Sequence, residues 1–164
     1  MGFAIKAQID GLGQVLARLQ EADKKVRRKL LRQAVNEAGK IVLAAAKARV
    51  PKGATGQLRR SLGRKVKVYR SSGTAVAIVG PRKGYKIDVD GRAVDPVHYA
   101  HLVEYGRRAA AVKTRKVLST GKVVFGRKAA AVPAHPFMRP ALDSTRDAVR
   151  QAMTRIILEG LEAR

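Results

Sequence analysis

The chain has 164 residues, which is long enough for a single hydrophobic core. Its residues are 46% hydrophobic but only 4% aromatic, and alanine supplies much of the hydrophobic fraction, so we expect this core to be thin. It contains no cysteine, which excludes disulfides and thiolate metal sites. Its 35 lysines and arginines against 12 acidic residues give a formal net charge of +23, which favours a polyanionic partner, either nucleic acid or an acidic protein surface.

No segment approaches the roughly twenty uninterrupted apolar residues of a membrane-spanning helix, and the start of the chain lacks the long apolar core of a signal peptide. We therefore expect a soluble protein that forms one domain over residues 1–164.

Two kinds of apolar spacing alternate in the N-terminal third. Alternating residues over 3–9 predict a short strand that ends at Asp10-Gly11. Helical spacing follows over 12–19 and again over 23–49, where it predicts one helix about 40 Å long. This helix should stop at Val50-Pro51, because proline cannot continue it. Its expected apolar stripe comprises Val26, Leu30, Ala34, Ala38, Ile41, Ala45 and Ala48.

Two hairpins are predicted in the middle of the chain. After a loop and a brief helix or turn that ends at Leu62, Val66 and Val68 alternate with Lys65, Lys67 and Tyr69, and a turn at 71–73 leads to a second segment over 75–79. This pattern predicts a hairpin with one core face and one basic face. A second, smaller hairpin is expected over 85–94 around Asp90-Gly91.

A short helix and a basic arm follow. Residues 98–105 have helical spacing and end at Gly106, a typical C-terminal cap. Residues 107–128 read as a hairpin with a turn at 119–121, and its composition is too basic to pack on its own domain. We expect this arm to project toward a partner through Arg107, Arg108, Lys113, Arg115, Lys116, Lys122, Arg127 and Lys128.

Three prolines make the segment 133–142 rigid. Each proline should keep the residue before it, Val132, His135 or Arg139, in an extended conformation. We expect this strap to dock Phe137 into an apolar pocket and to point Arg139 outward. Pro140 should be the first residue of a final helix that reaches Leu161 along an apolar stripe of Leu142, Ala148, Val149, Ala152, Met153, Ile156 and Leu161.

These elements predict an α+β fold in which a long N-terminal helix and a C-terminal helix pack on a small antiparallel β-sheet with projecting hairpins. No recognisable nucleophile or phosphate-binding motif is present. His98, His101 and Glu104 have a spacing that could ligate a metal, but packing of His101 at an interface and pairing of Glu104 with an arginine are favoured. We therefore expect no enzyme, no cofactor and no metal.

Four segments together resemble the tailed-phage head-tail connector family, also called neck, minor tail component or tail-completion proteins. They are Ile9–Leu12, Thr55–Leu62 with the preceding Pro51, Tyr99–Gly106 and Pro133–Leu142. The resemblance implies a structural virion protein, made in the host bacterial cytoplasm, that forms a ring of six or twelve subunits and joins a tail to a DNA-filled head. It implies adjacent neck, connector or tail proteins as partners, with contact to packaged DNA possible and no membrane.

On this reading, three groups of residues make the interface. Tyr99, His101, Glu104 and Gly106 form a packing element, the arm contacts the partner, and the strap anchors the last helix through Pro133, His135, Pro136, Phe137 and Arg139. The alternative is a nonspecific nucleic-acid-binding protein. The net charge favours this alternative, but the few aromatic residues are scattered and form no evident platform for stacking bases.

Overall fold

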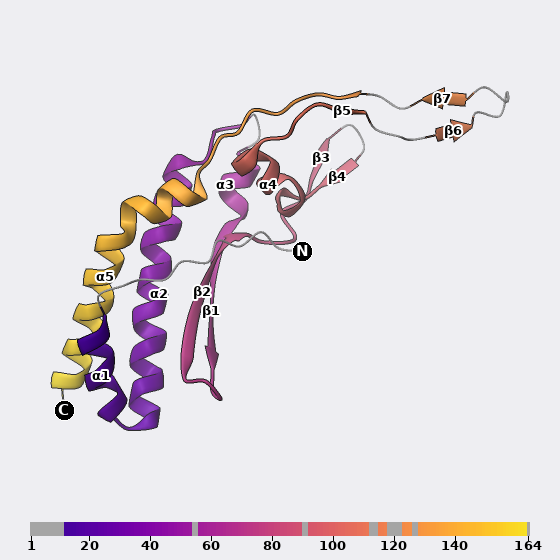
Figure 1. Cartoon of the computed structure of the whole chain (residues 1–164). Helices are drawn as coiled ribbons and strands as arrows, with labels where there is room; N and C mark the ends of the chain where they lie inside the picture. The colour runs from indigo at the N-terminus through magenta and orange to yellow at the C-terminus, as the bar shows by residue number, and fades with distance from the viewer. Residues whose placement is uncertain are drawn as a thin grey trace.

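The central element of the fold is the long helix α2 (Lys24–Arg49), which lies between the C-terminal helix α5 (Met138–Glu162) and the hairpin of β1 and β2 (Figure 1). This computed structural model describes residues 12–53, 56–89, 92–111, 115–117, 123–125 and 128–163. The α+β prediction is confirmed. The described strands form four separate antiparallel pairs instead of one sheet.

Helices form in the N-terminal third of the chain where the apolar spacing predicted them. Helix α1 (Gly13–Glu21) precedes α2, whose first turn is capped by Asp23: its carboxylate accepts a hydrogen bond from the Lys25 amide at 3.0 Å. Helix α2 ends at Arg49, and its C-cap residue Val50 stands immediately before the proline. The expected strand over 3–9 lies outside the described residues.

The first part of the core lies between α1, α2 and α5. Its buried residues are Leu12, Leu19, Leu30, Ala34, Val35, Ala38, Val149, Met153 and Ile157. The predicted stripes were wrong at Ala48 and Ala148, which are both exposed. The stripe on α2 also omitted Val35, Gly39 and Ala46, which are buried because α5 and the hairpin cover two sides of the helix.

Gly39 is the point of closest approach between α2 and the hairpin. A Cβ atom there would lie 3.2 Å from the Cβ of Ala77 and 3.3 Å from the Cδ of Arg64. Both distances are shorter than an ordinary van der Waals contact. Glycine, which has no Cβ, therefore allows α2 to pack this closely against the hairpin.

Strands β1 (Leu62–Tyr69) and β2 (Thr74–Pro81) form the first predicted hairpin, with Val66 opposite Ala77. The short helix α3 (Gln57–Ser61) leads into this hairpin. The inner face of the hairpin packs on α2 as expected, but its outer face is not purely basic. Val76 and Ile78 are 40% and 38% exposed there, opposite two lysines.

The second predicted hairpin is also present. It consists of β3 (Ile87–Val89) and β4 (Arg92–Val94), and the tip at residues 90–91 lies outside the described part of the chain. Helix α4 (Pro96–Tyr105) follows and ends at Gly106, whose φ of +70° is a left-handed value that favours glycine. The glycine cap is therefore confirmed.

The basic arm extends away from the helices, as Figure 1 shows in orange. Strand β5 (Ala110–Ala111) pairs with β8 (Lys128–Ala129), and β6 (Arg115–Val117) pairs with β7 (Val123–Phe125). The predicted hairpin is confirmed, while its turn at 119–121 lies outside the described residues. Among the described helices, none combines the length and apolarity that crossing a bilayer requires.

Candidate partner interface

A buried carboxylate joins α4 to the start of α5. Oε2 of Glu104 accepts hydrogen bonds from the amides of Phe137 at 2.8 Å and Met138 at 2.9 Å, and Oε1 accepts from the amide of Arg139 at 3.0 Å. Glu104 itself is only 2% exposed. The next residue, Pro140, has no N–H, so all four amide positions that a helix leaves unpaired at its start are accounted for.

This cap corrects two predictions about the start of α5. The helix begins at Met138, two residues before the expected start, and Arg139 is helical instead of extended. The preference that Pro140 imposes on Arg139 is overridden because the carboxylate holds three successive amides in the direction of the helix axis. Val132 is extended as predicted, since it forms a β-bridge with Arg107.

The expected pairing of Glu104 with an arginine was also wrong, because its carboxylate serves the three amides. His98 and His101 are exposed, and they precede the buried carboxylate by six and three residues, about two turns and one turn of the helix. Among the described residues, no group of three or more potential ligands could hold a metal ion.

The strap runs antiparallel to the end of α4 and is tied to it through the backbone. The amide of His135 donates to the carbonyl of Val103 at 2.7 Å, and Arg107 and Val132 exchange two hydrogen bonds of 2.8 Å. A Cβ on Gly106 would lie 2.8 Å from the carbonyl oxygen of Val132, so only glycine permits this approach. The base of the arm is thereby fixed to the body of the protein.

The strap places Phe137 in the second part of the core. Its side chain is 0% exposed, and the pocket that holds it is built by α2, α3, α4 and β1, so the predicted docking is confirmed. Its buried neighbours are Ala46, Val50, Leu58, Leu62, Ala100, Met138 and Ala141, with Tyr99 partly buried beside them. Arg139 is exposed, as expected.

An open groove of about 700 Å³ runs beside the strap. Arg49 from the end of α2, Tyr105 from the end of α4 and Arg139 from α5 line it, together with the exposed Pro136. Tyr105 is 61% exposed, which is unusual for a large aromatic side chain. Sequence reasoning missed Arg49 and Tyr105, although each stands directly before a helix stop.

Asp95 was missed as well, and it organises the other end of α4. Its carboxylate accepts hydrogen bonds from the amides of Gly84 at 2.8 Å and Val97 at 3.3 Å. The hydrogen bond from Gly84 is the main reason that the pKa of Asp95 lies below its usual value, despite burial. Burial, followed by the charge of Asp95, raises the pKa of Tyr99. The sequence signal was an Asp-Pro pair at a helix start.

The predicted arm residues are placed to different extents. Arg107 and Arg108 stand exposed at the base, and Nη2 of Arg107 donates to the carbonyl of Ala130 at 3.0 Å. Arg115 and Lys116 belong to β6 and Lys128 to β8. The remaining arm residues lie outside the described part of the chain: Lys113, Lys122 and Arg127.

The protein consists of a capped helical body, a rigid strap and a projecting basic arm. These features are typical of a structural component. The family model described as "Bacteriophage HK97-gp10, putative tail-component" matches residues 13–106, more than half of the chain. The chain therefore belongs to the HK97-gp10-like family of bacteriophage tail components, a structural family whose role is not enzymatic. The match ends at Gly106, before the arm, the strap and α5. Comparisons with curated proteins and with solved structures find no match.

Proposed function

We propose that this tail component is a neck or tail-completion subunit that forms an oligomeric ring and joins the tail to a DNA-filled head. The observation that carries the proposal is the junction at which the arm leaves the body. There the bridge between Arg107 and Val132 fixes the base of the arm, and the groove of Arg49, Tyr105 and Arg139 opens beside the same strap.

A recess and a projection on one subunit suit a heterologous interface. In such an interface two different surfaces meet, and a ring closes when the rotation between neighbours is repeated a whole number of times. The arm would supply one surface and the strap-side groove the other, or the arm would reach an adjacent ring. Each contact would be modest alone but would be repeated around the ring.

The residues expected at the interface then divide into two roles. Pro136 and Arg139 are exposed and would touch the neighbouring subunit, together with His135 and Pro133 on the same strap. Phe137 and Glu104 are enclosed by their own subunit and would act by holding the strap in position. Tyr99 belongs to the same supporting layer, while His101 is exposed next to it.

Electron microscopy of infected-cell lysates tests the proposal. Neutralising three arm residues with Arg115→Gln, Lys116→Gln and Lys122→Gln should leave finished heads and tails that are not joined. The matched control removes three charges from the exposed start of α2 with Lys24→Gln, Lys25→Gln and Lys29→Gln, and joining should persist. Native mass spectrometry of both proteins should show rings for the control. Joined particles with the arm variant, or a monomeric wild type, would contradict the proposal.

Nonspecific nucleic-acid binding is the second candidate, and the net charge of +23 favours it. Duplex DNA binding across a salt series discriminates the two. Micromolar affinity that falls steeply with salt, in a protein that never forms rings, supports this second function. Absence of binding at low salt removes it.

A further inference from the structure

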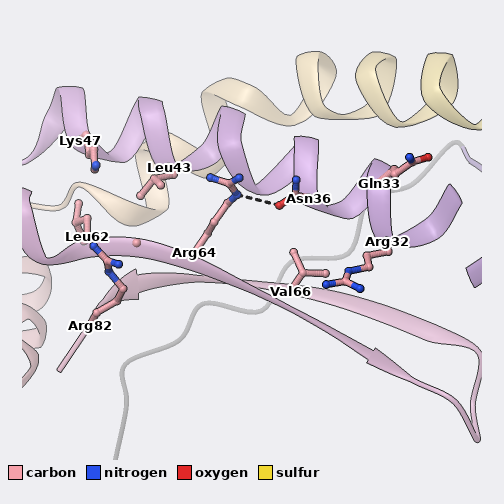
Figure 2. A pocket seen from close by; sticks show the side chains of 10 residues that line it. Arg32, Gln33, Asn36, Leu43, Lys47, Leu62, Arg64, Val66 and Arg82 are labelled. Carbon is pink, nitrogen blue, oxygen red and sulfur yellow. Dashed lines mark hydrogen bonds between the residues drawn. The ribbon is translucent and has the colours of Figure 1, made fainter. Parts of the chain in front are cut away.

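A second groove, lined mainly by basic and amide side chains, lies between α2 and β1, away from the strap (Figure 2). Its volume is about 570 Å³, within the range of small-ligand and peptide pockets. Its cationic lining comes from three places: Arg32 and Lys47 on α2, Arg64 on β1, and Arg82 just after β2. All ten lining residues are described, and none of them is acidic.

Two of the four cations are held in place by the protein. Nε of Arg64 donates to Oδ1 of Asn36 at 3.1 Å, the contact drawn in Figure 2. The guanidinium of Arg82 lies 5.0 Å from the centre of the Tyr85 ring and hydrogen-bonds the Tyr85 hydroxyl. Because these side chains are ordered in advance, an anion would bind with a smaller loss of conformational entropy.

Gly63 contributes to this arrangement. A Cβ atom at position 63 would lie 2.3 Å from Nε of Arg82, so the glycine lets the arginine side chain lie across the strand. The groove therefore combines positioned cations with an absence of carboxylates in its lining. Its positive charges repel one another until an anion enters.

We propose that this groove binds an acidic peptide segment with interleaved aliphatic residues, contributed by another protein. Carboxylates of the segment would pair with the arginines and Lys47, where bidentate Arg–carboxylate contacts give both energy and geometry. The aliphatic side chains would contact Leu43 and Val66.

The apolar part of the lining distinguishes a peptide from nucleic acid. Leu43 and Val66 are partly exposed in the groove and would gain nothing from a phosphodiester chain. Arg64 is half-buried between helix and strand, where a peptide carboxylate can reach it but a wide duplex cannot enter.

A second copy of this chain is a poor source of the acidic segment. Its exposed carboxylates at Asp143, Asp147 and Glu159 each already lie within 4.0 Å of an arginine three or four residues away. Its densest acidic stretch with aliphatic neighbours, Asp88-Val89-Asp90, carries two carboxylates, fewer than the four cations that line the groove. The occupant is therefore a different protein, and this holds whether or not the strap-side groove is the ring interface.

Fluorescence anisotropy with the full-length protein tests the proposal at low salt. The probe is a fluorescein-labelled ten-residue peptide of alternating Glu and Leu, and the second probe replaces every Leu with Ser at the same charge. The groove variant is Arg32→Gln with Lys47→Gln, and the matched variant is Lys24→Gln with Lys25→Gln, which removes two charges elsewhere on α2. Circular dichroism checks that both variants keep the wild-type melting curve.

We expect the groove variant to bind the Glu–Leu peptide about tenfold or more weakly, and the matched variant to stay within about twofold of wild type. The Glu–Ser peptide should bind several-fold more weakly than the Glu–Leu peptide. Equal loss in both variants, or equal binding of both peptides, would overturn the proposal. A labelled duplex DNA that competes for the same site, with affinity lost only in the groove variant, would assign the groove to nucleic acid instead. Failure of ring assembly has no bearing on any of these readings.

Discussion

The Glu104 carboxylate and the Phe137 amide, 33 residues apart in the chain, meet at 2.8 Å in the interior of the protein. This contact joins the last turn of α4 to the residue that immediately precedes α5. It lets one side chain stabilise a helix start that has no capping side chain of its own. The position of the strap, and with it the base of the arm, depends on this pair.

Replacing Glu104 should therefore destabilise the whole fold. Glu104→Ala leaves the amides of residues 137, 138 and 139 buried or partly buried without a partner, and we expect a loss of about 3 kcal/mol or more in the free energy of unfolding. Glu104→Gln should lie in between, because its amide keeps one acceptor oxygen but loses the charge. Urea denaturation measures both, with the exposed Glu162→Gln as the control. A loss below about 1 kcal/mol for the alanine variant contradicts the role assigned here.

Gly106→Ala should be costly for two reasons. Its φ is +70°, and the new Cβ would lie 2.8 Å from the carbonyl oxygen of Val132. We expect a loss of about 1–3 kcal/mol in the free energy of unfolding and faster amide exchange at Arg107 and Val132, whose bridge must shift. Gly13→Ala is the control, since nothing lies within 4 Å of its Cβ position. Unchanged exchange at the bridge would show that the strap tolerates a side chain at position 106.

Phe137→Ala should unfold the subunit before it affects any contact between subunits. The side chain is fully buried, and large-to-small substitutions of core phenylalanines cost about 3–5 kcal/mol. Arg139→Ala, at an exposed position in the same strap, should keep the wild-type melting temperature and weaken ring assembly. Thermal melts and native mass spectrometry separate the two effects. A stable, monomeric Phe137→Ala protein would instead place this side chain in an interface.

Gly39→Leu should separate α2 from the hairpin. The Cβ alone would approach Ala77 to 3.2 Å, and the longer side chain has no space between helix and sheet. Overpacking of this kind costs about 1–3 kcal/mol, even though leucine is the better helix former. Ala44→Leu, on the exposed side of the same helix, should be neutral or slightly stabilising in the same urea titration. If both variants had the same stability, the close packing at Gly39 would not matter.

Acid should remove the contribution of Asp95. Its pKa lies below the usual value of 3.8 in the folded protein, so its ionised form stabilises the fold above that value. This stability is lost as the pH falls below 3.8 through the folded-state pKa. Asp95→Asn should be less stable than wild type at neutral pH, and the difference between the two should shrink in acid. Melting temperatures between pH 2 and pH 7 measure it, and a difference that does not vary with pH would refute the assignment.

Most of the secondary structure could be predicted, because it depends on residues close together in the chain. Helical spacing located α1 and α2, Pro51 ended α2, and the alternation around residues 71–73 located the first hairpin. The glycine cap at Gly106 and the burial of Phe137 were also predicted correctly. One error fell where a residue contacts a distant segment, at Arg139, and the predicted stripe on α2 missed Val35, Gly39 and Ala46 because that helix is buried on two sides.

The amino-acid order alone was therefore sufficient for the elements, the overall charge and the rigidity of the strap, since propensity, proline geometry and periodicity act within a few residues. It could not show that Glu104 caps α5 or that Arg32, Lys47, Arg64 and Arg82 share one groove. Those relationships depend on the path of the chain through space. Folding brings the end of α4 to the start of α5 and lays α2 against β1, and each surface acquires its chemistry only from the segments that meet there.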